Sequence, residues 1–448
     1  MTLLAIDWTG VAVKAGQFIL SFSILVVLHE LGHFIPARLF KVRVEKFYLF
    51  FDAWFSLFKK KIGDTEYGIG WIPFGGYVKI SGMIDESMDK EQMKLPPKPY
   101  EFRSKKAWQR LIIMVGGVVV NILLAIVIFI GITYKWGDTY TPMENLTYGV
   151  YADSLATKIG VQDGDKIVAV NGKRIEKIGT VGIEIAKSLA KDITVERDGK
   201  EINLPIPSGF IEKLTDNKFG GFTYVRYPLI VDSLLPKAKV VSGNIHIGDT
   251  LIGLNGIPVK YSSDLLHAQM PENKNVNLKF LRGKDTVNAT VFFADKGDYN
   301  ISFKSYPDVL GSKHIEYSFA ESIPKGFNRT WETLANYVQQ LKNLFTSKEM
   351  KVNKNLGGII SIGNTFPGVW DWQSFWTLTG IFSIILAFMN ILPIPALDGG
   401  HALFTIIEMI TGRKPSDKFM EYAQMVGMIL LLGLMAYALG LDVLRIFK

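Results

Sequence analysis

The sequence predicts a polytopic α-helical membrane protein: four transmembrane helices with a β-rich segment between the second and the third. Two observations carry this prediction. Four stretches nearly free of Asp, Glu, Lys and Arg approach or exceed the roughly 20 residues that span a bilayer. The long segment between the second and third stretch consists of short Val- and Ile-rich runs broken by Gly, Asn and Asp, which is typical of small β-rich domains.

The four apolar stretches give the expected spans. The first begins at Ala15 and runs into a polar motif, so we place the first helix with its motif at residues 1–40. The others are expected at 111–135, 372–397 and 422–441. A cleaved signal peptide is not expected at the N-terminus, because no basic region precedes the first run and no small-residue cleavage site follows it.

Basic residues predict the orientation of the chain. The 50 Lys and Arg exceed the 42 Asp and Glu by 8, an excess that suits nucleic acid or an anionic membrane face. Many of them lie in the link at 41–110, and Arg413, Lys414 and Lys418 lie in the short link between the last two spans. The positive-inside rule therefore makes both links cytoplasmic, and puts both termini and residues 136–371 outside. We expect the lipid bilayer as a partner and no nucleic acid.

Cysteine is absent from the chain. A thiolate nucleophile and disulfides are therefore excluded, and any metal site must use nitrogen and oxygen ligands.

An internal repeat marks the outer segment. Residues 164–172 read GDKIVAVNG, and 84 residues further on, residues 248–256 read GDTLIGLNG. Each copy predicts a turn, a strand, an Asn-Gly hairpin turn and a second strand. The pattern resembles bacterial PDZ domains, which are β-rich α+β domains that bind peptide ends. We expect two of them in tandem, at 145–210 and 226–297.

An amphipathic helix is expected at 319–347, after this tandem. Phe327, Trp331, Leu334 and Val338 follow a spacing of three and four residues. The helix could pack on a PDZ domain or lie on the membrane surface, and the sequence leaves both open.

The sharpest motif is His29-Glu30-Leu31-Gly32-His33 at the end of the first span. Both imidazoles lie on one face of a helix and can reach one metal ion, and Glu30 can act on a water molecule as general base. A helix that spells HExxH by chance and a proton relay are the alternatives. Ionisable residues at membrane depth cost several kcal/mol each and are functional by default, which favours a metal site.

A third ligand must come from elsewhere. Asp398 and His401 both follow the third span, and the sequence leaves the choice open. Gly399 and Gly400 would let backbone approach the metal closely. A helix end punctuated by Pro and Gly explains those residue types but not an Asp at the membrane boundary.

The two motifs together, HELGH in the first span and NxxPxPxLDGGH after the third, resemble the site-2 protease family of M50-type intramembrane zinc metalloproteases. Four spans and PDZ domains between the second and third match its bacterial, sigma-E-regulating branch. The resemblance implies that His29, His33 and Asp398 bind Zn²⁺ and that Glu30 is the general base. It also implies that Asn390 helps to hold the substrate and that His401 orients the loop around the ligands.

Residues 66–79, in the link at 41–110, are rich in glycine and aromatic residues and resemble the family's membrane-associated β-hairpin loop. Its edge strand could pair with an unwound substrate segment. The alternative is a loop that only packs against the first span. The expected substrate-binding residues are Gly68, Gly70, Pro73, Gly75 and Gly76.

By this resemblance the protein performs site-2 cleavage in regulated intramembrane proteolysis. The expected substrates are a single-span anti-sigma factor, already cut by a site-1 protease, and signal-peptide remnants. The PDZ tandem would exclude substrates with intact outer domains or bind newly exposed ends. The expected location is the bacterial inner membrane, with both termini and the PDZ domains periplasmic and the active site toward the cytoplasm.

Two other classes remain as alternatives. A PDZ membrane scaffold with a structural metal site would show a fourth ligand, for which His401 is the candidate. A transporter that uses Glu30 and Asp398 would show inverted repeats of helices, and the sequence has no such repeat. One departure from the family concerns the second span, in which residues 116–121 read GGVVVN where many relatives have Gly-Pro before the Asn. Residues 81–100 form a link with no assigned role.

Overall fold

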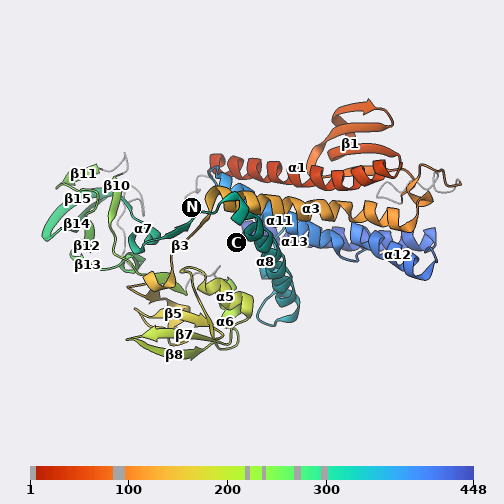
Figure 1. Ribbon diagram of the computed structural model, residues 1–448. Helices are drawn as coiled ribbons and strands as arrows, with labels where there is room; N and C mark the ends of the chain where they lie inside the picture. The colour runs from red at the N-terminus through yellow and green to blue at the C-terminus, as the bar shows by residue number, and fades with distance from the viewer. Residues whose placement is uncertain are drawn as a thin grey trace. The chain divides into compact units, whose positions relative to one another are not determined.

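The computed structural model describes residues 7–83, 96–216, 222–234, 239–266, 274–293 and 301–447. The chain divides into two compact units (Figure 1). We call them the helical unit, with Met1–Gly137, Glu316–Gln339 and Leu356–Lys448, and the β unit, with Asp138–Ile315 and Gln340–Asn355. Most of the predicted link at 81–100 lies outside the described residues.

Four long apolar helices form the helical unit: α1 (Trp8–Leu39), α3 (Ala107–Trp136), α11 (Trp372–Ile391) and α13 (Asp417–Ile446). Each is long and apolar enough to cross a membrane, as the sequence predicts. α1, α3 and α11 run side by side, and α3 contacts both of the others (Figure 1).

The third helix ends earlier than predicted. α11 stops at Ile391, short of the expected Leu397, and the chain restarts as α12 (Asp398–Thr411). Pro393 and Pro395 explain the break, because proline cannot donate the backbone hydrogen bond that a helix interior requires. The break places Asp398 in the first turn of a new helix.

Close backbone contact holds the helices together. A Cβ atom on Gly32 would lie 2.4 Å from the Gly116 carbonyl oxygen, and one on Gly380 would lie 3.1 Å from Ile128. In lipid there is little hydrophobic drive for helix association, so such small-residue contacts carry the packing. Buried aromatic rings, Phe18, Phe366, Phe375 and Phe382 among them, fill the space between α1 and α11.

The link after α1 forms a β-sheet from β1 (Val44–Ile62) and β2 (Thr65–Ile80). Both strands fold back on themselves: 46–49 pairs with 66–69 on one side and with 76–79 on the other, while 56–62 pairs with 65–70. The spatial order is therefore 56–62, 65–70, 46–49 and 76–80, with 76–80 at one edge. The predicted hairpin is present and is larger than expected. Gly76 packs against Val26 of α1.

Helix α8 (Phe319–Thr346) matches the predicted amphipathic helix. Its part within the helical unit packs on the apolar helices: a Cβ atom on Gly326 would lie 2.5 Å from the backbone of Ile130, and the rings of Tyr337 and Phe388 lie 5.6 Å apart. Phe327 and Trp331 are exposed. The short helices α9 (Val352–Asn355) and α10 (Ile359–Gly363) complete the connection to α11.

The first half of the β unit contains a four-stranded antiparallel sheet in the order β6-β5-β7-β8 and a separate pair, β4 with β9. Ile167, Ile185 and Ile193 are buried in its core. The elements are β4 (Val150–Ala152), α4 (Ser154–Lys158), β5 (Lys166–Val170), β6 (Lys173–Arg174), α5 (Val181–Ser188), β7 (Asp192–Arg197), β8 (Lys200–Pro205), α6 (Phe210–Asp216) and β9 (Thr223–Val225).

The second half contains a five-stranded sheet in the order β11-β15-β14-β12-β13 and the pair β10 with β16. This pair reaches Phe303, past the predicted boundary at 297. The elements are β10 (Val231–Leu234), β11 (Lys239–Ser242), β12 (Thr250–Leu254), β13 (Ile257–Pro258), β14 (Lys274–Arg282), β15 (Asp285–Phe293) and β16 (Ile301–Phe303). Outside both halves lie β3 (Asp138–Tyr140), α7 (Tyr306–Leu310) and β17 (Lys313–Ile315).

The predicted repeat is visible in the structure. Asn171 and Asn255 both have positive φ, at 48° and 46°, and each precedes a glycine of positive φ, as the Asn-Gly hairpin turn requires. The Asp of each Gly-Asp pair is buried and accepts two hydrogen bonds from one arginine. Arg197 donates both bonds to Asp165 at 2.8 Å, and Arg282 donates two bonds of 2.7–2.8 Å to Asp249 in the same way.

Candidate metal centre and substrate cavity

The two histidines of HELGH point into the helical bundle from α1. Both are buried, with 8% and 6% of the surface of His29 and His33 exposed. Their rings meet edge to face, and the two Nε2 atoms lie 3.3 Å apart. The i, i+4 spacing on one helical face therefore brings two metal-ligating nitrogens together, as predicted.

Asp398 completes a group of three. Its Oδ2 atom lies 3.3 Å from each Nε2 atom. Among the described residues, these three side chains form a group of metal-ligating type, in which one nitrogen or oxygen atom from each lies within 4.8 Å of the others. A tetrahedral zinc ion with bonds of about 2.0–2.1 Å separates its ligand atoms by about 3.3–3.4 Å. The three atoms thus have the spacing that zinc requires, and they leave the fourth position open.

Hydrogen bonds behind the rings favour the tautomer that binds metal. His33 Nδ1 lies 2.8 Å from the carbonyl oxygen of Ile113, so Nδ1 carries the proton and Nε2 keeps its lone pair. His29 Nδ1 lies 3.1 Å from the side-chain amide of Asn121, whose Oδ1 is buried without a partner. If the nitrogen and oxygen of the Asn121 amide exchange places, His29 Nδ1–H donates to Asn121 Oδ1. Nε2 of His29 then carries no proton and keeps its lone pair for a metal, like Nε2 of His33.

Glycines give the imidazoles their space. A Cβ atom on Gly117 would lie 2.5 Å from both His29 Cε1 and His33 Nε2. The run at 116–121, noted above as a departure from the family, therefore contains a residue in direct contact with the site, Gly117. Gly399 has a different role from the one expected: a Cβ atom there would lie 2.3 Å from the Ile391 carbonyl oxygen, so it brings α12 against the end of α11 rather than against the metal.

A cavity of about 660 Å³ opens beside the three ligands. Glu30, the neighbour of His29, lines it together with the triad. A carboxylate and an open metal position in the same cavity can act on one water molecule. This is the arrangement that the HExxH motif predicts.

The remaining residues expected near the third span lie around this cavity. Asn390 Nδ2 is 3.3 Å from His29 Nε2, which places this amide at the metal centre. His401 lines the cavity from α12 but is not one of the three grouped ligands. Ala396 also lines it with φ of 89°, a strained conformation of the kind that clusters at functional sites.

The hairpin residues divide into two groups. Gly76 lines the cavity and begins the edge segment 76–80, which lines it throughout. A Cβ atom on Gly68 would meet the Tyr48 ring, one on Gly70 the Phe51 backbone, and one on Gly75 the Phe51 ring. These three glycines shape the sheet, and they are not among the lining residues, nor is Pro73.

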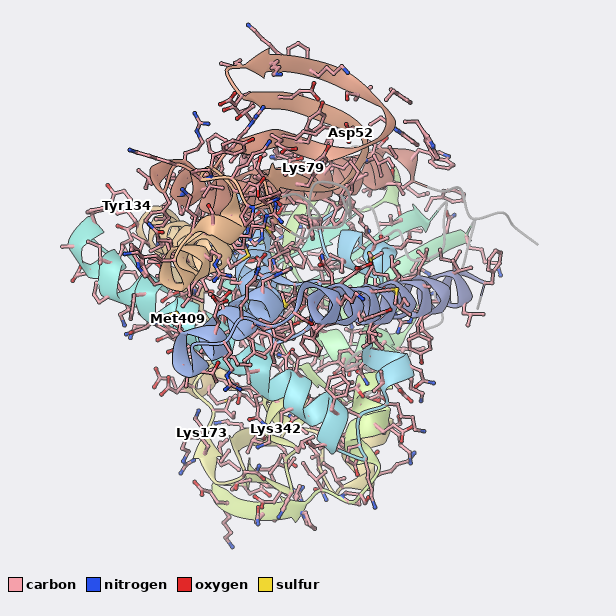
Figure 2. The ribbon with its side chains drawn as sticks, turned by 90° about the vertical axis from the view of Figure 1, so that its right-hand side faces the viewer. Asp52, Lys79, Tyr134, Lys173, Lys342 and Met409 are labelled. Carbon is pink, nitrogen blue, oxygen red and sulfur yellow. The ribbon has the colours of Figure 1, made fainter. Side chains whose placement is uncertain are left out.

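A polar network on the sheet extends the cavity away from the metal centre. Tyr77 donates a hydrogen bond of 2.9 Å to Asp52, and Lys46 lies 3.6 Å from the same carboxylate. Burial and the bond to Asp52 raise the pKa of Tyr77, so its hydroxyl stays a donor. Asp52 and Lys79 lie on the strands of this sheet (Figure 2). Both line the cavity, which gives its far part a mixed charge.

Two polar residues of this region were missed by sequence reasoning. Asn121 and Gln424 stand in apolar helices, where a polar side chain is expensive and functional by default. Asn121 reaches His29, and Gln424 lines the cavity from α13. Their position inside the second and fourth spans was the signal that could have found them.

Comparison with known proteins decides the family. The model of "Peptidase family M50" matches residues 17–434. The chain belongs to peptidase family M50. Curated relatives span the whole chain: a "Putative zinc metalloprotease" of Neisseria meningitidis is 27% identical over 451 residues, covering 96% of this chain and 98% of its own. A protein of the same description from Rickettsia conorii is 28% identical over 442 residues, with the same coverage.

A relative of named activity, the "Regulator of sigma E protease" of Haemophilus influenzae, is 25% identical over 452 residues and covers 96% of this chain and 98% of its own. The predicted M50 resemblance, the metalloendopeptidase activity and zinc as the cofactor are confirmed. The protein is a multi-pass membrane zinc metalloprotease.

Proposed function

We propose that this M50 protease cuts single-span membrane proteins within or near their transmembrane helix, with His29, His33 and Asp398 as zinc ligands. One observation carries the proposal. Ligand atoms from α1 and α12 meet at 3.3 Å spacing inside a helical unit whose four long helices can cross a membrane. A buried cluster of this kind is costly in lipid unless a cation is bound there.

The zinc ion, when bound, lowers the pKa of a water ligand to about 7 and polarises the peptide carbonyl. The residues of the chain supply the rest. Glu30 takes the proton of the attacking water and passes it to the leaving amine. Asn390, at 3.3 Å from His29, donates its amide to the substrate beside the reacting carbonyl. His401 holds the start of α12 around Asp398.

The edge segment 76–80 binds the substrate. A transmembrane helix hides its peptide groups in internal hydrogen bonds, so it must unwind before hydrolysis. Segment 76–80 pairs with 44–49 on one side, and among the described residues no strand pairs with its other side. The free side can add an extended substrate segment as a further strand, inside the cavity that holds Glu30.

The two halves of the β unit are a PDZ tandem outside the membrane. Their shared Gly-Asp and Asn-Gly signatures and the repeated Asp–Arg pair support this assignment. By the positive-inside rule the tandem is periplasmic, the termini are periplasmic, and the link that carries the sheet is cytoplasmic. The tandem then excludes substrates with intact outer domains or binds ends made by a site-1 protease. Anti-sigma factors and signal-peptide remnants are the substrate classes.

The test uses the full chain, purified in detergent, and a tagged single-span anti-sigma-type protein without its outer domain. Wild type, Glu30→Gln and wild type stripped by a chelator run side by side, with zinc content measured in each. We expect cleavage by wild type alone, return of cleavage when zinc is added back, and a cut site in the transmembrane segment. Equal cleavage by Glu30→Gln, or a zinc-loaded wild type that leaves this substrate intact, would contradict the proposal.

A further inference from the structure

Gln424 is a polar residue in the cavity wall that the proposed mechanism does not use. It is the only Asn, Gln or charged residue between Tyr422 and Leu441, in the apolar run of α13. Its surface is 7% exposed, and its Oε1 atom has no hydrogen-bond partner among the described residues. An unpaired amide oxygen at membrane depth destabilises the protein, so its presence needs a reason.

The backbone places this amide beside the loop at 392–397, which joins α11 to α12 and leads to Asp398. A Cβ atom on Gly427, one helical turn after Gln424, would lie 1.5 Å from the Pro395 carbonyl oxygen, so α13 touches the loop directly. Ala396 and Leu397, the next residues of that loop, line the same cavity as Gln424. The amide therefore belongs to the wall made by α13 and the loop, and segment 76–80 lines the same cavity.

An unwound substrate segment carries peptide groups that could serve as hydrogen-bond partners of this amide. Peptide N–H and C=O groups of an extended chain point alternately to its two sides. Pairing with segment 76–80 satisfies one side only, and any peptide group on the other side that is shielded from water needs a partner from the cavity wall. A carboxamide has one acceptor and two donor hydrogens, so it can pair with a peptide group in the way another peptide would.

We propose that Gln424 contacts the substrate by hydrogen bonding a backbone peptide group of the unwound segment, on the side that segment 76–80 leaves free. This inference rests on the proposed intramembrane cleavage and names one more residue that binds its substrate. Gln424 is then a binding residue that recognises main chain and not sequence.

The first test separates binding from structure. Gln424→Met keeps the length of the side chain and removes the amide, and Met425→Leu, at an exposed position of the same helical turn, is the matched control. We expect Gln424→Met to raise KM about 3- to 10-fold, the worth of one hydrogen bond, with kcat and zinc content near those of wild type. Its Tm should be unchanged or higher, because an unpaired buried amide is gone. A lower Tm with an unchanged KM would assign Gln424 to structure alone and overturn the proposal.

The second test identifies the partner group. A synthetic transmembrane substrate is made as a set in which single backbone amides around the cut site are replaced by esters, each of which lacks one N–H and weakens one acceptor. For wild type, one ester should raise KM by about the same factor as Gln424→Met does with the all-amide peptide. For Gln424→Met, the ester at that position should raise KM no further. Identical ester profiles for the two enzymes would overturn the proposal.

The two proposals fail in different ways. If neither wild type nor Glu30→Gln cuts the all-amide peptide, the proposed function falls and the role of Gln424 falls with it. If wild type cuts and Glu30→Gln does not, the function stands, and the ester profile alone decides on Gln424.

Discussion

Gly116 of α3 touches Gly32 of α1 through bare backbone: a Cβ atom on Gly116 would lie 1.9 Å from the Gly32 carbonyl oxygen. This contact sets the distance between the two helices at the level of the metal centre. It also presses the next residue, Gly117, against both imidazoles. The geometry of the proposed zinc ligands thus depends on the absence of side chains on a helix that supplies none of them.

Gly117→Ala should damage the metal centre without affecting the membrane spans. The added methyl group overlaps both rings, so the histidines must move, and a displacement near 1 Å can cost about 100-fold in rate. We expect activity to fall by about that factor and zinc to bind more weakly. The measurements are cleavage rate and zinc titration of the purified protein. Gly131→Ala, on the same helix with open space around it, should behave like wild type; similar losses in both variants would argue for a general helix effect.

Asn121→Leu should weaken zinc binding by about 10- to 100-fold, because a hydrogen bond that orients a ligating histidine is lost. Asn121→Asp keeps an acceptor for His29 Nδ1–H and should retain much of the affinity. Competition with a chelator of known affinity measures both variants. If Asp and Leu weaken binding equally, the amide acts through packing and our tautomer assignment is wrong.

Asp442 near the end of α13 holds the segment before α11. Its buried carboxylate accepts hydrogen bonds from the backbone N–H groups of Gly358, Ile360 and Ser361 at 3.0–3.1 Å. Asp442→Leu leaves these donors unpaired, which should cost about 1–3 kcal/mol. Hydrogen exchange should therefore rise in residues 358–363. Asp442→Asn retains one acceptor oxygen and should give an intermediate rate of exchange. Unchanged exchange in the Leu variant would show that Asp442 does not hold this segment.

Acid should loosen the second half of the β unit through Asp249. Hydrogen bonds from Arg282 hold the pKa of Asp249 below its usual value. The stabilisation is therefore present above the unfolded pKa of about 3.9 and is lost as the pH falls below it toward the folded pKa. Hydrogen exchange of 276–282 in the full chain should rise between pH 5 and pH 3 after correction for intrinsic rates.

Arg282→Met provides the control for that experiment. It should already raise exchange in this half at pH 7, while the Asp165–Arg197 half of the same chain stays protected. If wild type and Arg282→Met lose the same protection on acidification, another group controls the acid response.

Most of the architecture could be read from the residues in order. Span length, the i, i+4 histidines around Glu30 and the repeated Asn-Gly turns are local patterns, and each follows from the geometry of one helix or one hairpin. The end of the third helix was misplaced, because apolar character continues through Pro393 while backbone hydrogen bonding does not.

The sequence alone determined that the protein carries a metal motif in a membrane span and left Asp398 and His401 as candidates for a third ligand. The family resemblance favoured Asp398 and added Asn390. Only the tertiary structure decided that Asp398 meets both histidines, that Gly117 makes room for them, and which part of the sheet reaches the cavity. The physical reason is that these relationships join residues far apart in the chain. Their distances are set by how closely helices pack and where strands fold back, and no local pattern encodes either.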